Sequence, residues 1–229
     1  MQAETPRDRF RAHPESLFLY AVSDDAWLEG RTLASCCADA VRGGATFLQL
    51  RAKHATTGEL VDAYASIRRE LAAQGMARAV PFVIDDDVDA ALAAGADGVH
   101  VGQSDASCAD ARARLGEGAI VGVSAQTVEQ ALAAQAAGAD YLGVGALFKT
   151  ATKPEAADVS LQTLASICAA VEIPVVGIGG LNTATFASLA GTGVRGAAVV
   201  SAIFAARDIV GATADLRSVL ERVDLSLRS

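Results

Sequence analysis

Three consecutive aspartates, Asp85, Asp86 and Asp87, directly follow the short apolar run 81–84, which predicts a buried strand. Adjacent carboxylates repel one another, so a fold tolerates them where the side chains diverge into water, cap the next helix or share a cation. Asp105 stands in the matching position after the following strand-like run. Two carboxylates so placed indicate a site for a hard, oxygen-preferring ion such as Mg²⁺. The alternative is that Asp86 or Asp87 only caps the helix that follows.

A second polar group spans the end of the earlier strand-like run 46–50. Gln49, Arg51 and Lys53 alternate along the extended chain, so their side chains share one face. Arginine grips phosphate through two parallel hydrogen bonds, and lysine acts as a compact point charge. The three residues therefore predict a phosphate clamp, with a solvated loop as the alternative.

Hydroxyl groups and cations recur in two later loops. Ser124 precedes a helical pattern whose amino end favours an anion, although Ser124 or Thr127 taken alone predicts a helix cap. The segment 149–153 has no helical period and carries two hydroxyls and two ammonium groups. Long loops in compact domains are often lids or ligand loops. This segment therefore predicts contact with an anionic ligand.

Apolar runs and helical patterns alternate from Leu17 to Val223, and these elements must position the polar side chains. Glycines mark several passages from a helix into a strand, because glycine supplies the left-handed stop that a tight return needs. The expected strands are 17–22, 46–50, 80–84, 98–101, 119–123, 141–144, 174–178 and 196–200. The expected helices are 31–43, 58–74, 88–94, 108–115, 128–137, 161–170, 183–190 and 209–223.

Eight strand–helix units without a boundary signal predict an α/β protein, a single (β/α)8 TIM barrel over residues 17–229, with an open doubly wound sheet as runner-up. Residues 1–16 carry mixed charge, prolines and no periodicity, which predicts a flexible N-terminal arm. In such barrels chemistry gathers at the carboxyl ends of the strands. The Gly-rich run 177–180 and the pair Val200 and Ser201 end the last two expected strands, where barrels often bind phosphate.

Composition excludes several function classes. The net charge is −8 and no Lys/Arg cluster is present, which argues against nucleic acid as the main partner. No run approaches the ~18 apolar residues of a membrane span, and the first residues are polar, so neither membrane insertion nor secretion is expected. The four cysteines lack metal-ligand spacing and indicate packing residues in a reducing compartment, the cytoplasm. The sequence leaves a homo-oligomer open.

The histidines are weak candidates for chemistry. His100 lies inside the expected strand 98–101, which favours a satisfied core or helix-facing histidine over a catalytic base. His13 falls in the expected arm. His54 follows the basic cluster, where contact with a ligand is the less favoured interpretation.

Seven short motifs in unbroken order make the chain resemble thiamine-phosphate synthase over residues 17–223. They are Gln-Leu-Arg-x-Lys from Gln49, Asp-Asp-Asp-Val-x-x-Ala-Leu from Asp85, Val-His-Val-Gly-Gln-x-Asp from Val99, Gly-Val-Ser-Ala from Gly122, Thr-x-Thr-Lys from Thr150, Gly-Ile-Gly-Gly from Gly177 and Val-Ser-Ala from Val200. Each motif alone is weak, but seven at compatible spacing are specific.

The resemblance implies a Mg²⁺-dependent barrel enzyme that joins 4-amino-2-methyl-5-hydroxymethylpyrimidine diphosphate to a thiazole phosphate, or to its carboxylated form. The products are thiamine monophosphate and diphosphate, formed by a dissociative step. It implies that Asp86 and Asp105 bind the metal, and that Arg51, Ser124 and Lys153 take part in catalysis. The residues implied for the pyrimidine diphosphate are Gln49, Arg51, Lys53, Asp85, Ser124 and Lys153. Those implied for the thiazole phosphate are Thr150, Thr152, Gly180, Val200 and Ser201.

Four positions depart from the family pattern. Asp85 stands where the family usually has an Asn that helps to recognise the pyrimidine, and an ionised aspartate cannot donate a hydrogen bond to a ring nitrogen. Gln126 replaces a common His, and Ala146 and Lys149 replace prolines.

Two alternatives to the synthase differ in class. The first is a thiazole tautomerase, the sibling branch of the same barrel, which the resemblance says depends on the His replaced by Gln126. The second is a non-catalytic barrel that only binds a phosphorylated thiazole, which Asp85 alone favours.

Overall fold

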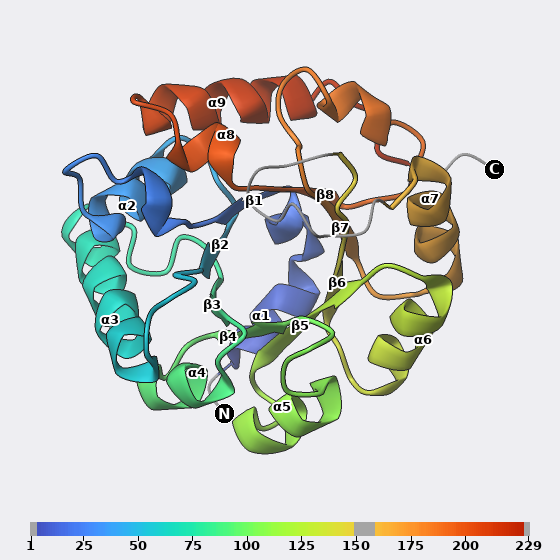
Figure 1. The fold of residues 1–229 in the computed structure, drawn as a ribbon, viewed down its shortest axis with the longest axis horizontal. Coiled ribbons are helices and arrows are strands. Elements are labelled where there is room, and N and C mark those ends of the chain that lie inside the picture. Colours follow the sequence, from blue (N-terminus) through green and yellow to red (C-terminus); the bar gives the residue numbers. More distant parts are fainter. Residues whose placement is uncertain (1–3, 149–158, 227–229) are drawn as a thin grey trace.

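The computed structural model describes residues 4–148 and 159–226, and its centre is a closed barrel of eight parallel strands (Figure 1). Each strand pairs with its neighbours in chain order, and β8 pairs with β1 with Leu19 opposite Ala197, which closes the ring. The strands are β1 Leu19–Val22, β2 Phe47–Leu50, β3 Phe82–Asp85, β4 Gly98–Val101, β5 Ile120–Ala125, β6 Tyr141–Val144, β7 Val175–Ile178 and β8 Gly196–Val199. The expected (β/α)8 barrel is therefore confirmed.

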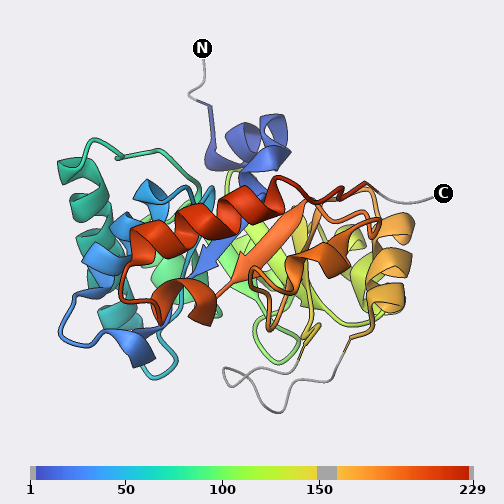
Figure 2. The ribbon, with the colours of Figure 1, turned by 90° about the horizontal axis from the view of Figure 1, so that it is seen from above.

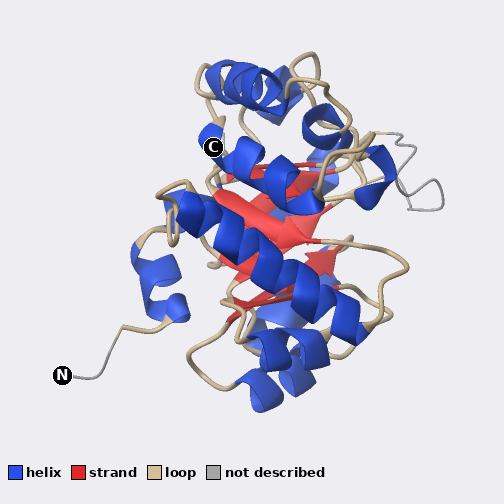
Figure 3. Ribbon diagram, turned by 90° about the vertical axis from the view of Figure 1, so that its left-hand side faces the viewer, coloured by secondary structure: helices blue, strands red, loops and turns tan. Residues whose placement is uncertain are grey.

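Helices surround the barrel as an outer layer (Figures 1 and 3). They are α2 Leu33–Arg42, α3 Thr57–Ala73, α4 Val88–Ala94, α5 Cys108–Leu115, α6 Val128–Ala136, α7 Leu161–Ala170, α8 Ser201–Phe204 and α9 Ile209–Leu220, with α1 Pro6–Ala12 at one end. Strand residues alternate between two cores. In β1, Leu19 and Ala21 face the helices, whereas Tyr20 and Val22 fill the barrel.

Two of the polar residues next to the predicted site have a structural role, because their side chains cap helices. Asp87 accepts a hydrogen bond from the backbone N–H of Ala90 at 2.8 Å and so begins α4. Thr127 does the same for α6 through the N–H of Gln130 at 3.2 Å. The caps of α4 and α6 are therefore Asp87 and Thr127 rather than Asp86 and Ser124.

The expected helix 183–190 is wrong, because only the 3₁₀ turn η3, Phe186–Leu189, forms there. The Asn182 side chain accepts the N–H of Ala184, and the Thr185 hydroxyl accepts the N–H of Asn182. These local bonds compete with helical pairing and hold the chain in a turn. The helix α8 was not predicted either, because its four residues are too few to show a helical period.

The expectation of a flexible arm over residues 1–16 is wrong for residues 6–16, because α1 and the 3₁₀ helix η1, Pro14–Leu17, form there. Thr5 and Asp8 make a reciprocal capping box at the start of α1. Phe10 is only 2% exposed and packs with Tyr20, Phe47 and other residues inside the barrel. The helix α1 has too few turns for its apolar residues to show a helical period, so the sequence pattern did not predict it.

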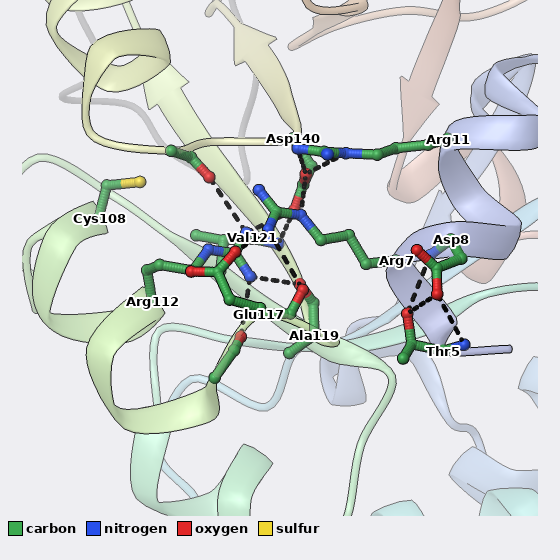
Figure 4. Close-up of polar contacts among 12 residues, drawn as sticks. Thr5, Arg7, Asp8, Arg11, Cys108, Arg112, Glu117, Ala119, Val121 and Asp140 are labelled. Carbon is green, nitrogen blue, oxygen red and sulfur yellow. Dashed lines mark hydrogen bonds and ion pairs between the residues drawn. The ribbon is translucent and has the colours of Figure 1, made fainter. Parts of the chain in front are cut away.

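The helix α1 lies at the amino end of the barrel (Figure 2), and a buried carboxylate fastens it there (Figure 4). Asp140, whose side chain is fully buried, accepts from Arg7 at 2.8 Å, from Arg112 at 2.6 Å and from the Val121 N–H at 3.0 Å. Arg11 adds a contact at 3.2 Å from a side chain that is 58% exposed. Buried charges are stable only when they are paired in this way.

No helix among the described residues is both long and apolar enough to span a membrane. All four cysteines are free thiols. Burial raises the pKa of Cys168 to about 12 and that of Cys37 above its usual range, as expected for thiols that serve packing.

Candidate active site

A cavity of about 460 Å³ lies at the carboxyl ends of the strands. Its lining brings together residues that lie far apart in the sequence. The predicted residues that line it are Gln49, Arg51, Asp85, Asp86, Asp105, Ser124, Gly180, Val200 and Ser201. Each of them lies at or just after the end of a strand, which is where a barrel gathers its chemistry.

Four predicted residues remain, of which the structure describes one. Lys53 is exposed in the turn after β2 and is not part of the lining. Thr150, Thr152 and Lys153, with Lys149, lie outside the described residues.

The two candidate metal-binding carboxylates sit on adjacent loops. Asp86 is exposed and has a left-handed backbone with φ of 61°, while its N–H donates to the His100 carbonyl at 2.8 Å. Aspartate adopts this conformation more readily than most residues, and its cost is typical of functional sites. Asp105 accepts the N–H of Gly102 at 2.8 Å through Oδ2. That bond fixes the carboxylate at the rim of the cavity.

Arg51 is held between two carboxylates. Its guanidinium donates to Asp24 Oδ2 at 2.7 Å, and its Nε lies 3.6 Å from Asp85 Oδ2. All three side chains are about nine-tenths buried. Asp24 was not predicted as a site residue, although it follows the end of β1 closely, as Asp86 follows β3, and its position at a strand end could have indicated it.

His100 is buried, as expected, but it faces the barrel interior and the cavity rather than a helix. Its neighbours Val99 and Val101 face the helices, so alternation along β4 turns His100 inward. Its Nε2 lies 3.0 Å from the Ser124 hydroxyl, and its Nδ1 lies 3.1 Å from the Tyr141 hydroxyl. The sequence pattern could not reveal this orientation. Side chains on both faces of a barrel strand are buried, one face inside the barrel and the other under the helices.

The Tyr141 hydroxyl continues this line of contacts to Tyr20, 2.8 Å away. Burial raises the pKa of both phenols well above their usual range. Both hydroxyls therefore keep their protons at neutral pH and act as donors.

The opposite side of the cavity is built from the loops after β7 and β8. Gly179 and Gly180 have φ of 98° and 66°, a region that glycine enters without strain. A Cβ on Gly179 would lie 2.7 Å from Ala146 Cα, so this loop packs too closely for a side chain. Val200 and Ser201 follow β8, and α8 starts at Ser201. Loops of this kind present backbone N–H groups to phosphate oxygens.

A family model described as "Thiamine monophosphate synthase" matches residues 19–203. The chain belongs to the thiamine monophosphate synthase family. The matched residues include all eight strands and every residue that lines the cavity. The family resemblance expected from the sequence motifs is thus confirmed.

Curated members of the thiamine monophosphate synthase family cover most of the chain. A thiamine-phosphate synthase of Ruminiclostridium cellulolyticum is 47% identical over 83% of this chain and 89% of its own length. One from Chloroflexus aurantiacus is 43% identical over 91% of this chain and 95% of its own. The solved structure of a thiamine phosphate pyrophosphorylase from Pyrococcus furiosus superposes with a TM-score of 0.80 at 36% identity. It covers 90% of this chain and 96% of that one.

Two further polar residues line the cavity of this thiamine monophosphate synthase family member. Gln126 directs its side-chain amide to the Gly145 carbonyl at 3.4 Å. Gln103 donates to the Ser124 carbonyl at 2.6 Å, and so ties the β4 loop to β5. Gln103 belongs to the motif Val-His-Val-Gly-Gln-x-Asp from Val99, but a glutamine between a glycine and a serine does not by itself predict a site residue.

Proposed function

We propose that this cavity joins 4-amino-2-methyl-5-hydroxymethylpyrimidine diphosphate to a thiazole phosphate, giving thiamine monophosphate and diphosphate. The names of the curated relatives support this reaction. The observation that carries the proposal is the sharing of one cavity by Arg51, Asp86 and Asp105. A buried cation and two exposed carboxylates, facing a glycine-rich loop, suit a metal-bound diphosphate on one side and a phosphate on the other.

Asp86 and Asp105 are the proposed Mg²⁺ ligands, and the donor set fits that ion. Among the residues that the structure describes, no cluster of three or more acidic, histidine or cysteine side chains forms a complete metal cage. Mg²⁺ does not need one, because it is usually bound by one or two carboxylates together with water and substrate phosphates. When bound, the ion would neutralise charge on the departing diphosphate.

Arg51 is the proposed centre of the diphosphate site. Its hydrogen bond to Asp24 and its ion pair with Asp85 fix the guanidinium before any ligand arrives, so less side-chain freedom is lost on binding. Gln49, which is 4% exposed, lines the same wall and can donate its amide to an oxygen. Ser124 completes this side of the cavity, and Lys153 is proposed to supply further positive charge. Lys53 enters the proposal only as an exposed cation in the turn after β2, because it is outside the lining.

The loops after β7 and β8 are the proposed site of the thiazole phosphate. Gly180, Val200 and Ser201 line the cavity there. The backbone N–H groups of such loops, together with the Ser201 hydroxyl, are donors suited to a phosphate dianion. Thr150 and Thr152 are proposed to add hydroxyl donors.

These assignments account for the reaction by electrostatics and positioning. Diphosphate leaves a carbon attached to an electron-rich aminopyrimidine, so negative charge builds up on the leaving group. Arg51 and Lys153 oppose that charge in a protected site, which is often the largest catalytic contribution. Holding both substrates in one cavity supplies up to roughly 7 to 11 kcal/mol of the barrier in favourable cases. No covalent nucleophile is needed.

A direct assay tests the proposed reaction. Purified protein is mixed with both phosphorylated substrates, with and without Mg²⁺, and thiamine monophosphate and diphosphate are measured. The synthase predicts both products only when the metal is present. Isomerisation of a thiazole carboxylate phosphate without the pyrimidine would instead identify a tautomerase. Saturable binding of the thiazole phosphate with no product would identify a binding protein.

A cytoplasmic location also belongs to the proposal. The four free thiols, three of them buried, suit a reducing compartment. Small phosphorylated substrates of the proposed kind carry charges that keep them inside cells.

A further inference from the structure

A continuous line of hydrogen bonds runs from the barrel core to the cavity. It passes from the Tyr20 hydroxyl to that of Tyr141 at 2.8 Å, then to His100 Nδ1 at 3.1 Å. From His100 Nε2 it reaches the Ser124 hydroxyl at 3.0 Å. Tyr20, Tyr141 and His100 are buried, whereas Ser124 is half-buried and lines the cavity. The line therefore has one closed end and one end that a ligand can reach.

Counting protons along this line gives it one direction. Among the described residues, Tyr141 is the hydrogen-bond partner of the Tyr20 hydroxyl, so the Tyr20 proton must go to the Tyr141 oxygen. The Tyr141 proton then goes to His100 Nδ1. In the reverse direction the Tyr20 proton would be buried without an acceptor, a costly arrangement. His100 Nδ1 is thus an acceptor, and the proton of the neutral ring lies on Nε2.

We propose that His100 is a positioning residue that turns the Ser124 hydroxyl into a hydrogen-bond donor aimed into the cavity. Because His100 Nε2–H donates to Ser124 Oγ, the Ser124 proton cannot point back into the barrel. It points toward the space lined by Arg51 and Asp86. The ligand atom that meets Ser124 is therefore an acceptor, and under the proposed function it belongs to the pyrimidine diphosphate.

The tautomer can be measured without any substrate, so this test is independent of the proposed function. The chain has three histidines, and His13 and His54 are exposed and serve as internal references. Protein labelled with ¹⁵N-histidine is examined by long-range proton–nitrogen correlation NMR. We expect His100 to show a protonated Nε2 and an unprotonated Nδ1. A protonated Nδ1 with an unprotonated Nε2 would reverse the direction and overturn the proposal.

Two matched phenylalanine variants test the source of this direction. Tyr141→Phe removes the donor to His100 Nδ1, so the nitrogen signals should show a mixture of tautomers, and kcat/KM for the pyrimidine diphosphate should fall about tenfold. In Tyr20→Phe, the Tyr141 proton still has His100 as its acceptor, so the tautomer and kcat/KM should be retained. Equal effects of the two variants on both measurements would contradict the proposal. Circular dichroism checks that each variant is folded.

Two substitutions of His100 separate its roles. The amide nitrogen of Gln in His100→Gln can take the place of Nε2 and still donate to Ser124, whereas that in His100→Asn lies nearer the position of Nδ1. We expect His100→Gln to keep kcat/KM within about threefold and His100→Asn to lose about tenfold, the range of one hydrogen bond. Ser124→Ala should remove the difference between them. A difference that persists in Ser124→Ala would show that His100 acts elsewhere.

Discussion

The Arg51 guanidinium lies 2.7 Å from the Asp24 carboxylate, which follows a different strand of the barrel. This ion pair is nine-tenths buried, so solvent screens it little. It joins the ends of β1 and β2 and holds a cation at the cavity wall. An arginine anchored in this way presents its remaining N–H groups to an anion in a fixed direction.

Asp24→Asn should weaken binding of the pyrimidine diphosphate. The amide cannot hold the guanidinium as firmly, and a hydrogen bond to a charged group contributes about 1.5 to 3 kcal/mol, or roughly 10- to 100-fold in affinity. We expect KM for this substrate to rise within that range while kcat changes less. Asp25→Asn is the matched control, because Asp25 is adjacent and exposed. Equal KM values for the two variants would refute the role of Asp24.

Asp86→Asn should reduce turnover and raise the Mg²⁺ concentration needed for half-maximal rate, because the metal loses one charged ligand. Asparagine accepts the left-handed backbone at position 86, so the free energy of unfolding should change by less than about 0.5 kcal/mol. Asp87→Asn is the control, since asparagine also caps helices and Asp87 faces α4. A similar Mg²⁺ response in both variants would contradict the assignment of Asp86.

Asp85→Asn should keep or improve activity if position 85 contacts the pyrimidine. The change removes a negative charge beside the metal site and restores a donor for a ring nitrogen. It also relaxes the 3.6 Å contact with Arg51, while the shorter bond to Asp24 remains. Steady-state kinetics with both substrates measures the effect. A large loss of kcat/KM would mean that this protein uses the carboxylate itself.

Asp140→Asn should destabilise the fold without altering the site. The change removes the carboxylate that pairs with the buried guanidinium of Arg112 and one of the two carboxylates that pair with Arg7, which costs about 3 to 5 kcal/mol. Arg11→Ala, at the exposed edge of the same network, should cost less than about 1 kcal/mol. Urea unfolding followed by circular dichroism gives both values, and similar losses would show that burial of Asp140 is unimportant.

Much of the barrel could be predicted because local signals and the overall fold agree. The expected bounds of the helices 88–94, 108–115 and 161–170 and of the strands 98–101 and 141–144 match the structure. Each is a short element with glycine or a capping side chain next to at least one of its ends. The turn η3 and the helix α1 could not be predicted from the sequence. Side-chain hydrogen bonds and long-range burial determine them, and neither leaves a period in the sequence.

The site residues likewise fall into those that could be predicted from the sequence and those that could not. Residues at strand ends, such as Arg51, Asp86 and Asp105, could be predicted because barrel topology alone brings them together. The orientation of His100 and its bonds to Ser124 and Tyr141 depend on which face of β4 turns inward. That choice follows from packing around the whole ring, which a single strand does not reveal.

The aromatic core beneath the cavity limits the route by which ligands can enter and leave. Phe10 lies 6.0 Å from Phe47 and 5.8 Å from Tyr141 between ring centroids, and these rings fill the barrel behind His100. Within residues 4–148 and 159–226, the cavity is therefore closed toward the barrel core and opens at the carboxyl ends of the strands. Under the proposed reaction, diphosphate must leave through the opening by which both substrates enter. Product release and the entry of new substrates therefore cannot occur at the same time.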